Sequence, residues 1–177
     1  MVQVYWGDGK GKTTAAMGQA LRAVGAGWRV VVVQFLKDGT SGELAPLSAL
    51  PGVGPVLHDG AQAKFTFRMT EQEKADSHVL HDANLGRALR QARQAGDAPG
   101  SLLVLDEALD ALRAGLLDEE LLVQAMDWAA GQDACELVIT GHCLPECVAG
   151  RADYITRMSC EAHPYTRGVA ARAGVEY

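Results

Sequence analysis

The sequence is short of cysteine and of long apolar runs, and each shortage excludes a class of protein. The four cysteines contain no Cys-x-x-Cys pair, so neither a disulfide framework nor a thiolate zinc site is expected. Cys143 and Cys147, near His142, are compatible with a metal site, but we expect small buried thiols instead. No apolar run reaches the roughly 20 residues of a membrane-spanning helix. The start of the chain also lacks the features of a secretion signal, so we expect a cytoplasmic protein without a membrane partner.

An excess of positive charge is missing too. The chain has 22 acidic and 16 basic residues and a formal net charge of −6, which argues against a nucleic-acid partner. Charged residues make up 21% and hydrophobic residues 48%, a balance typical of globular proteins. No repeat, low-complexity tract or linker divides the 177 residues, so residues 1–177 are predicted to form a single domain.

The chain alternates short β-branched runs with longer helical stretches, which predicts an α/β fold: a mostly parallel sheet with helices on both faces. Strands are expected at residues 2–6, 30–36, 102–105, 137–139 and 153–158. Helices are expected at residues 12–24, 71–94 and 119–130. Residues 51–67 are the hardest to assign, and we expect a short strand and a mobile loop there.

A glycine-rich loop between the first strand and the first helix carries the strongest functional signal. Its expected nucleotide-binding residues are Gly7, Asp8, Gly9, Lys10, Gly11, Lys12, Thr13 and Thr14. Backbone N–H groups and a helix N-terminus would hold phosphates there, Lys12 would reach phosphate oxygens, and the Thr13 hydroxyl would bind Mg²⁺. The loop is one residue shorter than the usual phosphate-binding pattern, because its first glycine is Gly7 where that spacing requires one at Trp6. The alternative is a glycine turn without a ligand.

Two acids follow the strand expected at residues 102–105. Asp106 and Glu107 would lie at the carboxyl edge of a central strand, where open α/β sheets bind ligands. One of them would hold magnesium opposite Thr13, although solvated acids at a strand end are the alternative reading. Together with the loop, these acids predict a magnesium–nucleoside triphosphate site in a P-loop NTPase-like (RecA-like) fold.

A further lysine lies at the same predicted edge of the sheet. Lys37 follows the strand expected at residues 30–36. From this position alone, it is equally expected to face the polyphosphate or to be solvated. With Lys10 and Lys12 it would suit a triphosphate of high charge. Charge spread over three phosphates is held most strongly when the chain departs as one piece, so these cations would stabilise a leaving group.

Five stretches share a characteristic order and spacing: GDGKGKTTAAMGQALRAVGAG, VVVVQFLK, LLVLDE, LVITGH and the ending HPYTRGVAARAGVEY. They resemble the P-loop-type corrinoid adenosyltransferases (ATP:cob(I)alamin adenosyltransferases) over nearly the whole chain. The shortened loop with its extra lysine and the Gln-Phe-x-Lys strand end are both characteristic of that family.

The resemblance implies that a cob(I)alamin nucleophile attacks the 5′ carbon of ATP, held in a flipped orientation, and displaces intact triphosphate. Lys12, Lys37 and Glu107 would be the catalytic residues, Thr13 and Glu107 would hold Mg²⁺, and Arg22 would touch the nucleotide. Family members are commonly homodimers, and an electron-donating reductase or flavoprotein would supply cob(I)alamin.

On the corrinoid side, Phe65 and Phe67 match an aromatic pair of the family that displaces the lower axial ligand of cobalt. From their spacing alone they would share one face of a strand, as core residues do. The chain departs from the family pattern at Phe67, His142 and Arg157, where relatives often have Trp, Arg and an acid respectively. Because the first strand is expected at residues 2–6, we also expect no counterpart of the N-terminal helix that covers the corrinoid in some relatives.

Two other function classes remain open from the residues. The first is a P-loop kinase acting on a small acceptor, which would need an acceptor-side base and usually a lid with arginines. The second is a regulatory ATPase module, since a glutamate after the magnesium acid can activate water. His78 and His81, with Glu73 and Asp82 nearby, are residue types that can ligate a metal, but we interpret them as a solvated helix face.

Overall fold

The computed structural model describes residues 1–60, 66–94 and 96–175. Its centre is a five-stranded sheet in the order β2-β3-β4-β1-β5, and every pair of neighbouring strands is parallel. The strands are β1 (Val2–Trp6), β2 (Arg29–Gln34), β3 (Ser101–Asp106), β4 (Cys135–Gly141) and β5 (Tyr154–Arg157). The α/β class expected from the sequence is therefore confirmed, and all carboxyl ends of the strands meet at one edge.

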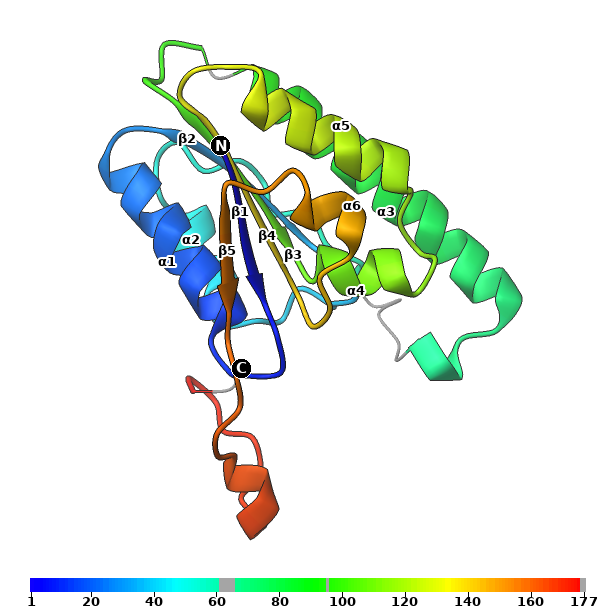
Figure 1. The fold of residues 1–177 in the computed structure, drawn as a ribbon. Helices are drawn as coiled ribbons and strands as arrows, with labels where there is room; N and C mark the ends of the chain where they lie inside the picture. Colours follow the sequence, from blue (N-terminus) through cyan, green and yellow to red (C-terminus); the bar gives the residue numbers. More distant parts are fainter. Residues whose placement is uncertain (61–65, 95, 176–177) are drawn as a thin grey trace.

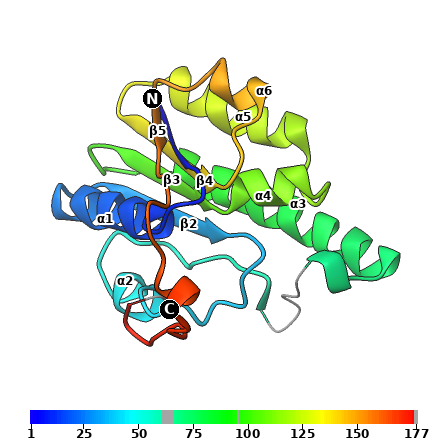
Figure 2. The same ribbon diagram turned by 60° about the horizontal axis from the view of Figure 1, so that its bottom comes forward.

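Helices cover both faces of the sheet, as Figures 1 and 2 show. The helices on one face are α1 (Lys12–Gly25) and α2 (Leu44–Ser48). Those on the other face are α3 (Glu71–Arg93), α4 (Ala108–Arg113), α5 (Glu119–Ala130) and α6 (Glu146–Ala149). Two short 3₁₀ turns complete the described chain, η2 (Thr66–Arg68) and η3 (Pro164–Arg167). No helix among the described residues is long and apolar enough to cross a membrane.

Two apolar cores, one on each face, hold the helices to the sheet. Val31 and Leu103 pack toward α3 and α5, whereas their strand neighbours Val32 and Leu102 pack toward α1. All four are fully buried. Successive side chains of a strand point to opposite faces, so a strand covered on both sides must be apolar throughout. This is why the central strands read as continuous Val and Leu runs.

The start of α1 differs from the starts of the two other long helices. Thr70 caps α3 in a reciprocal capping box with Glu73, and Asp118 caps α5. Both helices also carry acids in the first turn, which suit the positive end of the helix dipole. Helix α1 follows Gly11, has no side-chain cap and has no acid in its first turn. Its first N–H groups therefore lack the side-chain acceptor that the other two helices provide.

The sequence predicted the strand at residues 30–36 too long. Strand β2 ends at Gln34, and Leu36 has a φ of 58°, a left-handed conformation that turns the chain out of the sheet. Between residues 51 and 60 the expected short strand is reduced to single bridges, Val53 to Val30 and Leu57 to Val33. Phe65, an expected corrinoid contact, lies outside the described residues.

Two expectations about burial are wrong. His81 is fully buried rather than part of a solvated face, because the side of α3 that carries it packs against Phe35 at the end of β2. The four cysteines are free, but Cys143 is exposed and the other three are only half-buried. Cys135 and Cys147 pack only against the margin of one apolar core, and Cys143 and Cys160 lie in connecting segments, so none is the buried thiol expected from its size.

Candidate functional site

The phosphate-binding loop, residues 7–11, is built on close backbone packing that only glycine permits. Gly7 and Gly11 have φ values of 117° and 110°, which L-residues with a side chain rarely adopt. A Cβ atom on Gly9 would lie 2.8 Å from backbone atoms of Met158 and Ser159, and the Gly9 N–H donates to the Met158 carbonyl at 2.8 Å. The loop is thus fixed against the segment that follows β5.

Lys12 lies across this loop. Its ammonium donates to the carbonyls of Gly7 at 2.7 Å and Gly9 at 2.9 Å. An ammonium has three N–H bonds, so one remains for a phosphate oxygen. The uncapped N–H groups of α1 lie next to it in the chain, and such groups together with the helix dipole favour an anion.

Asp106 is the centre of the polar site. It is fully buried at the end of β3, and both of its carboxylate oxygens accept two hydrogen bonds. Oδ1 accepts from the hydroxyls of Thr13 at 2.9 Å and Thr140 at 2.8 Å. Oδ2 accepts from Lys37 Nζ at 2.7 Å and Gln34 Nε2 at 3.2 Å. Four chain segments therefore meet at one carboxylate.

Lys37 and Glu107 form the more accessible side of this cluster. Lys37 Nζ lies 2.7 Å from Asp106, 3.5 Å from Glu107 Oε1 and 3.2 Å from the Thr13 hydroxyl. Burial of the ammonium opposes its charge, but the two carboxylates outweigh that effect and raise the pKa of Lys37. Burial also raises the pKa of Glu107, and Lys37 offsets this only in part while Asp106 and Asp110 add to it. Glu107 is held in a left-handed conformation with a φ of 60°.

The sequence reading missed two residues of this cluster. Thr140 donates to Asp106 and also accepts from the Glu107 N–H at 2.8 Å. Gln34 is fully buried, and its Oε1 atom has no hydrogen-bond partner among the described residues. Both follow apolar runs at the carboxyl ends of strands that flank β3. A polar residue ending each neighbouring strand is the sequence signal that would have identified them.

His142 lies beside this cluster rather than in it. Its Nδ1 and its backbone N–H both lie 2.9 Å from Asp110 Oδ2. Asp110 also pairs with Arg113 at 3.1 Å. The position at which family relatives often have arginine is thus occupied by an imidazole that is tied to a carboxylate of α4.

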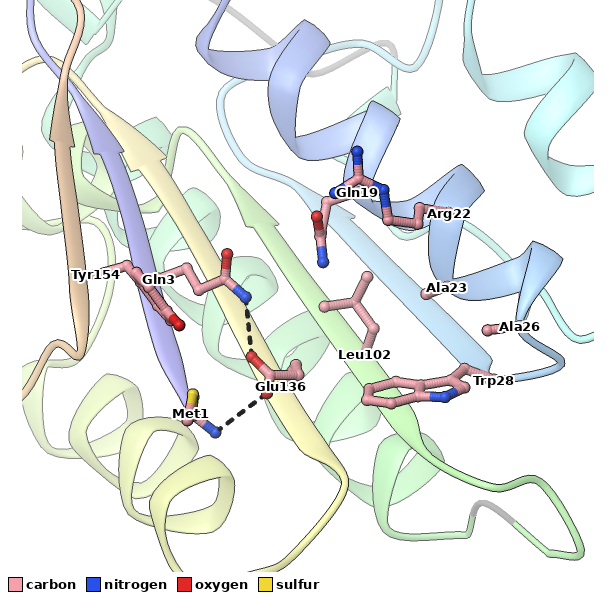
Figure 3. A pocket seen from close by; sticks show the side chains of 10 residues that line it. All are labelled: Met1, Gln3, Gln19, Arg22, Ala23, Ala26, Trp28, Leu102, Glu136 and Tyr154. Carbon is pink, nitrogen blue, oxygen red and sulfur yellow. Dashed lines mark hydrogen bonds and ion pairs between the residues drawn. The ribbon is translucent and has the colours of Figure 1, made fainter.

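The expected nucleotide contact Arg22 lies elsewhere. Arg22 is in the last turn of α1, and it lines a pocket of about 410 Å³ near the amino ends of the strands. Figure 3 shows it on the α1 side of this pocket, with Trp28 and with the hydrogen-bonded Gln3 and Glu136. At about 1.5 Å per residue, Arg22 lies about 15 Å along α1 from Lys12. Arg157 stacks on the Trp6 ring at 5.1 Å.

Phe67 is not a core residue. It lies in η2, and 77% of its surface is exposed. Arg68 lies over its ring at 5.5 Å. The turn precedes α3 at the carboxyl side of the sheet (Figure 1). The core-packing alternative is therefore wrong for Phe67, and its ring is accessible to a ligand.

Comparison with protein families gives a match along the full chain. The family described as ATP:corrinoid adenosyltransferase BtuR/CobO/CobP matches residues 1–177. A corrinoid adenosyltransferase of Pseudomonas aeruginosa is 32% identical over 176 residues, covering 98% of this chain and 82% of the relative. A corrinoid adenosyltransferase of Escherichia coli (strain K12) is 31% identical over 179 residues, covering 100% of this chain and 85% of the relative.

Solved structures with the same fold are more distant in sequence. The cytoplasmic domain of EssC superimposes with a TM-score of 0.53 at 15% identity, over 97% of this chain and 33% of that one. EssC ATPases 2 and 3 from Geobacillus thermodenitrificans give a TM-score of 0.54 at 13% identity, over 98% and 34%. These similarities support the P-loop NTPase-like fold alone. The match along residues 1–177 and the identities above 30% show that the chain belongs to the ATP:corrinoid adenosyltransferase BtuR/CobO/CobP family.

Proposed function

We propose that this protein transfers the 5′-deoxyadenosyl group of ATP to the cobalt of a reduced corrinoid and releases triphosphate, in the synthesis or salvage of an adenosylcorrinoid. Membership of the family supports the reaction. The observation that carries the proposal is the start of α1. Helices α3 and α5 begin with a capping side chain and acids, whereas α1 begins with a glycine loop, Lys12 and uncapped N–H groups. Such a helix start favours a polyanion.

The proposed chemistry explains why cations gather at one edge of the sheet. The C5′–O bond of ATP breaks, its electron pair leaves with the triphosphate, and the electron pair of the reduced cobalt forms the new cobalt–carbon bond. Negative charge therefore grows on the departing oxygen, and fixed cations that hold the whole triphosphate stabilise the transition state. Lys12 and Lys37 are the side chains that we assign to this role.

The proposed ATP site comprises residues 7–14 and Lys37. Lys10 is exposed on the loop, where it can add a further positive charge to the triphosphate. Arg22 is a weaker candidate than the sequence suggested, because it lines a pocket at the other end of α1. We therefore propose that the phosphates are held without it.

A magnesium ion fits the same edge. The oxygens of Thr13, Asp106 and Glu107 are of the hard type that Mg²⁺ prefers, and the Gln34 Oε1 atom without a partner lies on the side chain that donates to Asp106. We propose that Thr13 and Glu107 hold the ion and that Asp106 orients Thr13, whose hydroxyl donates to it. When bound, the ion would neutralise part of the phosphate charge.

The remaining parts of the proposal concern partners. We assign Phe67 to the corrinoid, because an accessible aromatic ring can displace the lower axial ligand and leave a cobalt that is easier to reduce. Cob(I)alamin must be generated by a strong reductant, so we propose an electron-donating reductase or flavoprotein as a partner in the cytoplasm. A homodimer is proposed from the resemblance.

ATP hydrolysis is the second candidate: in this alternative Asp106 would hold the ion, and Glu107, which directly follows it and has a raised pKa, would act as a general base toward water. Anaerobic incubation with ATP, Mg²⁺ and reduced cobalamin separates the alternatives. We expect a light-sensitive alkylcobalt spectrum together with intact triphosphate. ADP with orthophosphate would support hydrolysis instead, and ADP with a phosphorylated acceptor would support a kinase.

Replacement of Lys12 by alanine is expected to lower turnover by at least about 100-fold, because it removes a charge that faces the leaving group. Turnover is measured as alkylcobalt formed per minute under anaerobic conditions. Lys74→Ala is the matched control, since Lys74 pairs with Glu71 at the surface of α3. Near-normal turnover of Lys12→Ala would contradict the role assigned to Lys12.

Glu107→Gln is expected to stabilise the ligand-free protein near neutral pH while reducing activity. Because the pKa of Glu107 is raised on folding, the folded state holds the proton more tightly than the unfolded chain does. Ionisation of Glu107 therefore lowers stability as the pH rises from the unfolded pKa to the folded one. The amide does not ionise, so its advantage should be present near pH 7 and vanish toward about pH 4.

Thermal unfolding at both pH values checks this prediction. Glu161→Gln is the control, because Glu161 is exposed. An advantage of Glu107→Gln that is equal at both pH values, or larger in acid, would show that burial of the Glu107 charge has no cost.

Phe67→Ala is expected to reduce turnover about 5-fold when cob(II)alamin and a reductant are supplied, since an aromatic contact contributes about 1 kcal/mol. The loss should be smaller with cob(I)alamin reduced beforehand. Because the ring is exposed, the unfolding free energy should change by less than about 0.5 kcal/mol. Val79→Ala, at another exposed apolar residue, is the control. Equal losses with both cobalt states would contradict the role of Phe67 in reduction.

A further inference from the structure

A buried Asp–His pair lies beside the nucleotide edge and takes no part in the chemistry described above. His81 Nε2 lies 2.9 Å from each carboxylate oxygen of Asp59. Its Nδ1 lies 2.8 Å from the Leu116 carbonyl. The two side chains are 0% and 3% exposed. A carbonyl can only accept, so Nδ1 carries a proton and Nε2 shares a second proton with Asp59.

The pair contacts the chain at two points, one shortly before Lys37 and one at Lys37 itself. The His81 ring meets the ring of Phe35, two residues before Lys37, edge to face at 5.2 Å. The Asp59 N–H donates to the Lys37 carbonyl at 3.0 Å. His81 therefore joins α3 to both chain segments that determine where Lys37 lies.

The backbone around Lys37 needs such support. Leu36 is in the left-handed region with a φ of 58°, which a residue with a side chain holds only when its surroundings impose it. This conformation turns the chain out of β2 and lets Lys37 reach Asp106 and Thr13. Segment 57–60 runs beside this turn: Leu57 exchanges backbone hydrogen bonds with β2, and a Cβ on Gly39 would lie 2.5 Å from the His58 ring.

A buried polar pair is a poor way to gain stability, because apolar residues of similar volume often stabilise a fold as well or better. Such a pair instead determines how neighbouring elements are oriented. Hydrogen bonds depend on the angle between donor and acceptor, whereas apolar contacts depend little on orientation. Both ring nitrogens of His81 are engaged, and the ring contacts Phe35 before Lys37 and Asp59, whose N–H donates to the Lys37 carbonyl. This arrangement favours a role in geometry.

We propose that the Asp59–His81 pair positions Lys37 for the triphosphate of ATP. His81 is a positioning residue, since it acts through Phe35 and Asp59 on the backbone of Lys37 and does not itself touch the phosphates. The inference rests on the proposed function only in its assignment of Lys37 to the polyphosphate. Loss of the pair should therefore weaken ATP binding by releasing Lys37 from its place beside Asp106.

The test is a double-mutant cycle between His81 and Lys37, with the dissociation constant of Mg–ATP measured by calorimetry as the readout. His81→Gln places an amide near the position of Nε2 but cannot also donate to the Leu116 carbonyl. Lys37→Met keeps the apolar stem and removes the charge. We expect His81→Gln to weaken ATP binding about 5- to 10-fold in the wild-type background and less than about 2-fold in the Lys37→Met background.

The control is His78→Gln. His78 lies on the same helix, is 40% exposed and pairs with Asp82 at 3.1 Å. This variant should leave ATP binding unchanged. Asp59→Asn, which keeps the size of the side chain, provides a second variant if His81→Gln unfolds, and it should show the same dependence on Lys37. An equal weakening by His81→Gln with and without Lys37, or no weakening at all, would overturn the proposal.

The readout separates the two proposals. ATP binding is measured without cobalt, so the coupling between His81 and Lys37 is decided even if the protein hydrolyses ATP instead of transferring its adenosyl group. Absence of an alkylcobalt product would count against the proposed function, whereas additive effects in the cycle would count against the positioning role of His81.

Discussion

The site depends on one buried carboxylate. Asp106 has no exposed surface, and an unpaired charge in such a place would cost about 3–5 kcal/mol. It is stabilised by four donors: Thr13 at the start of α1, Gln34 at the end of β2, Lys37 beyond it and Thr140 in β4. Since β3 lies between β2 and β4 in the sheet, donors that follow or end both neighbouring strands reach the Asp106 carboxylate. The strand order therefore helps to determine which side chains surround Asp106.

The remainder of the edge follows from this constraint. Lys37 reaches Asp106 because Leu36 turns the chain with a positive φ, and Glu107 turns away from β3 with another. The phosphate-binding loop is held from the opposite side, where Gly9 donates to Met158 and Gly7 donates to the Gly141 carbonyl. The loop, the acids and the lysines are thus joined by hydrogen bonds and ion pairs, and such a preset arrangement of charge is what the proposed stabilisation of a leaving group requires.

Much of this arrangement was predictable from the sequence, for physical reasons. A parallel sheet needs apolar strands covered on both faces, and the runs at residues 30–33 and 102–105 show that requirement directly. The glycine loop and the acids after β3 are local signals, so the sequence alone singled out Lys12, Thr13, Asp106 and Glu107 as candidates. Gln34, Thr140 and the Asp59–His81 pair were missed because their roles arise from contacts between distant segments. The spacing of His78 and His81 suggested one solvated face, yet α3 buries the second of them. The structure places Arg22 in the last turn of α1, too far from the loop to contact it directly.

The central claim is that the cations at this edge hold a triphosphate that leaves from carbon. The most direct measurement uses ATP labelled with ¹⁸O at the oxygen that bridges C5′ and the α-phosphorus, followed by mass spectrometry of the products formed with reduced cobalamin. The account predicts that the label leaves with triphosphate, because the C5′–O bond is the one that breaks. Label retained in the nucleoside product would mean that a phosphorus–oxygen bond is cleaved instead, and would contradict the account.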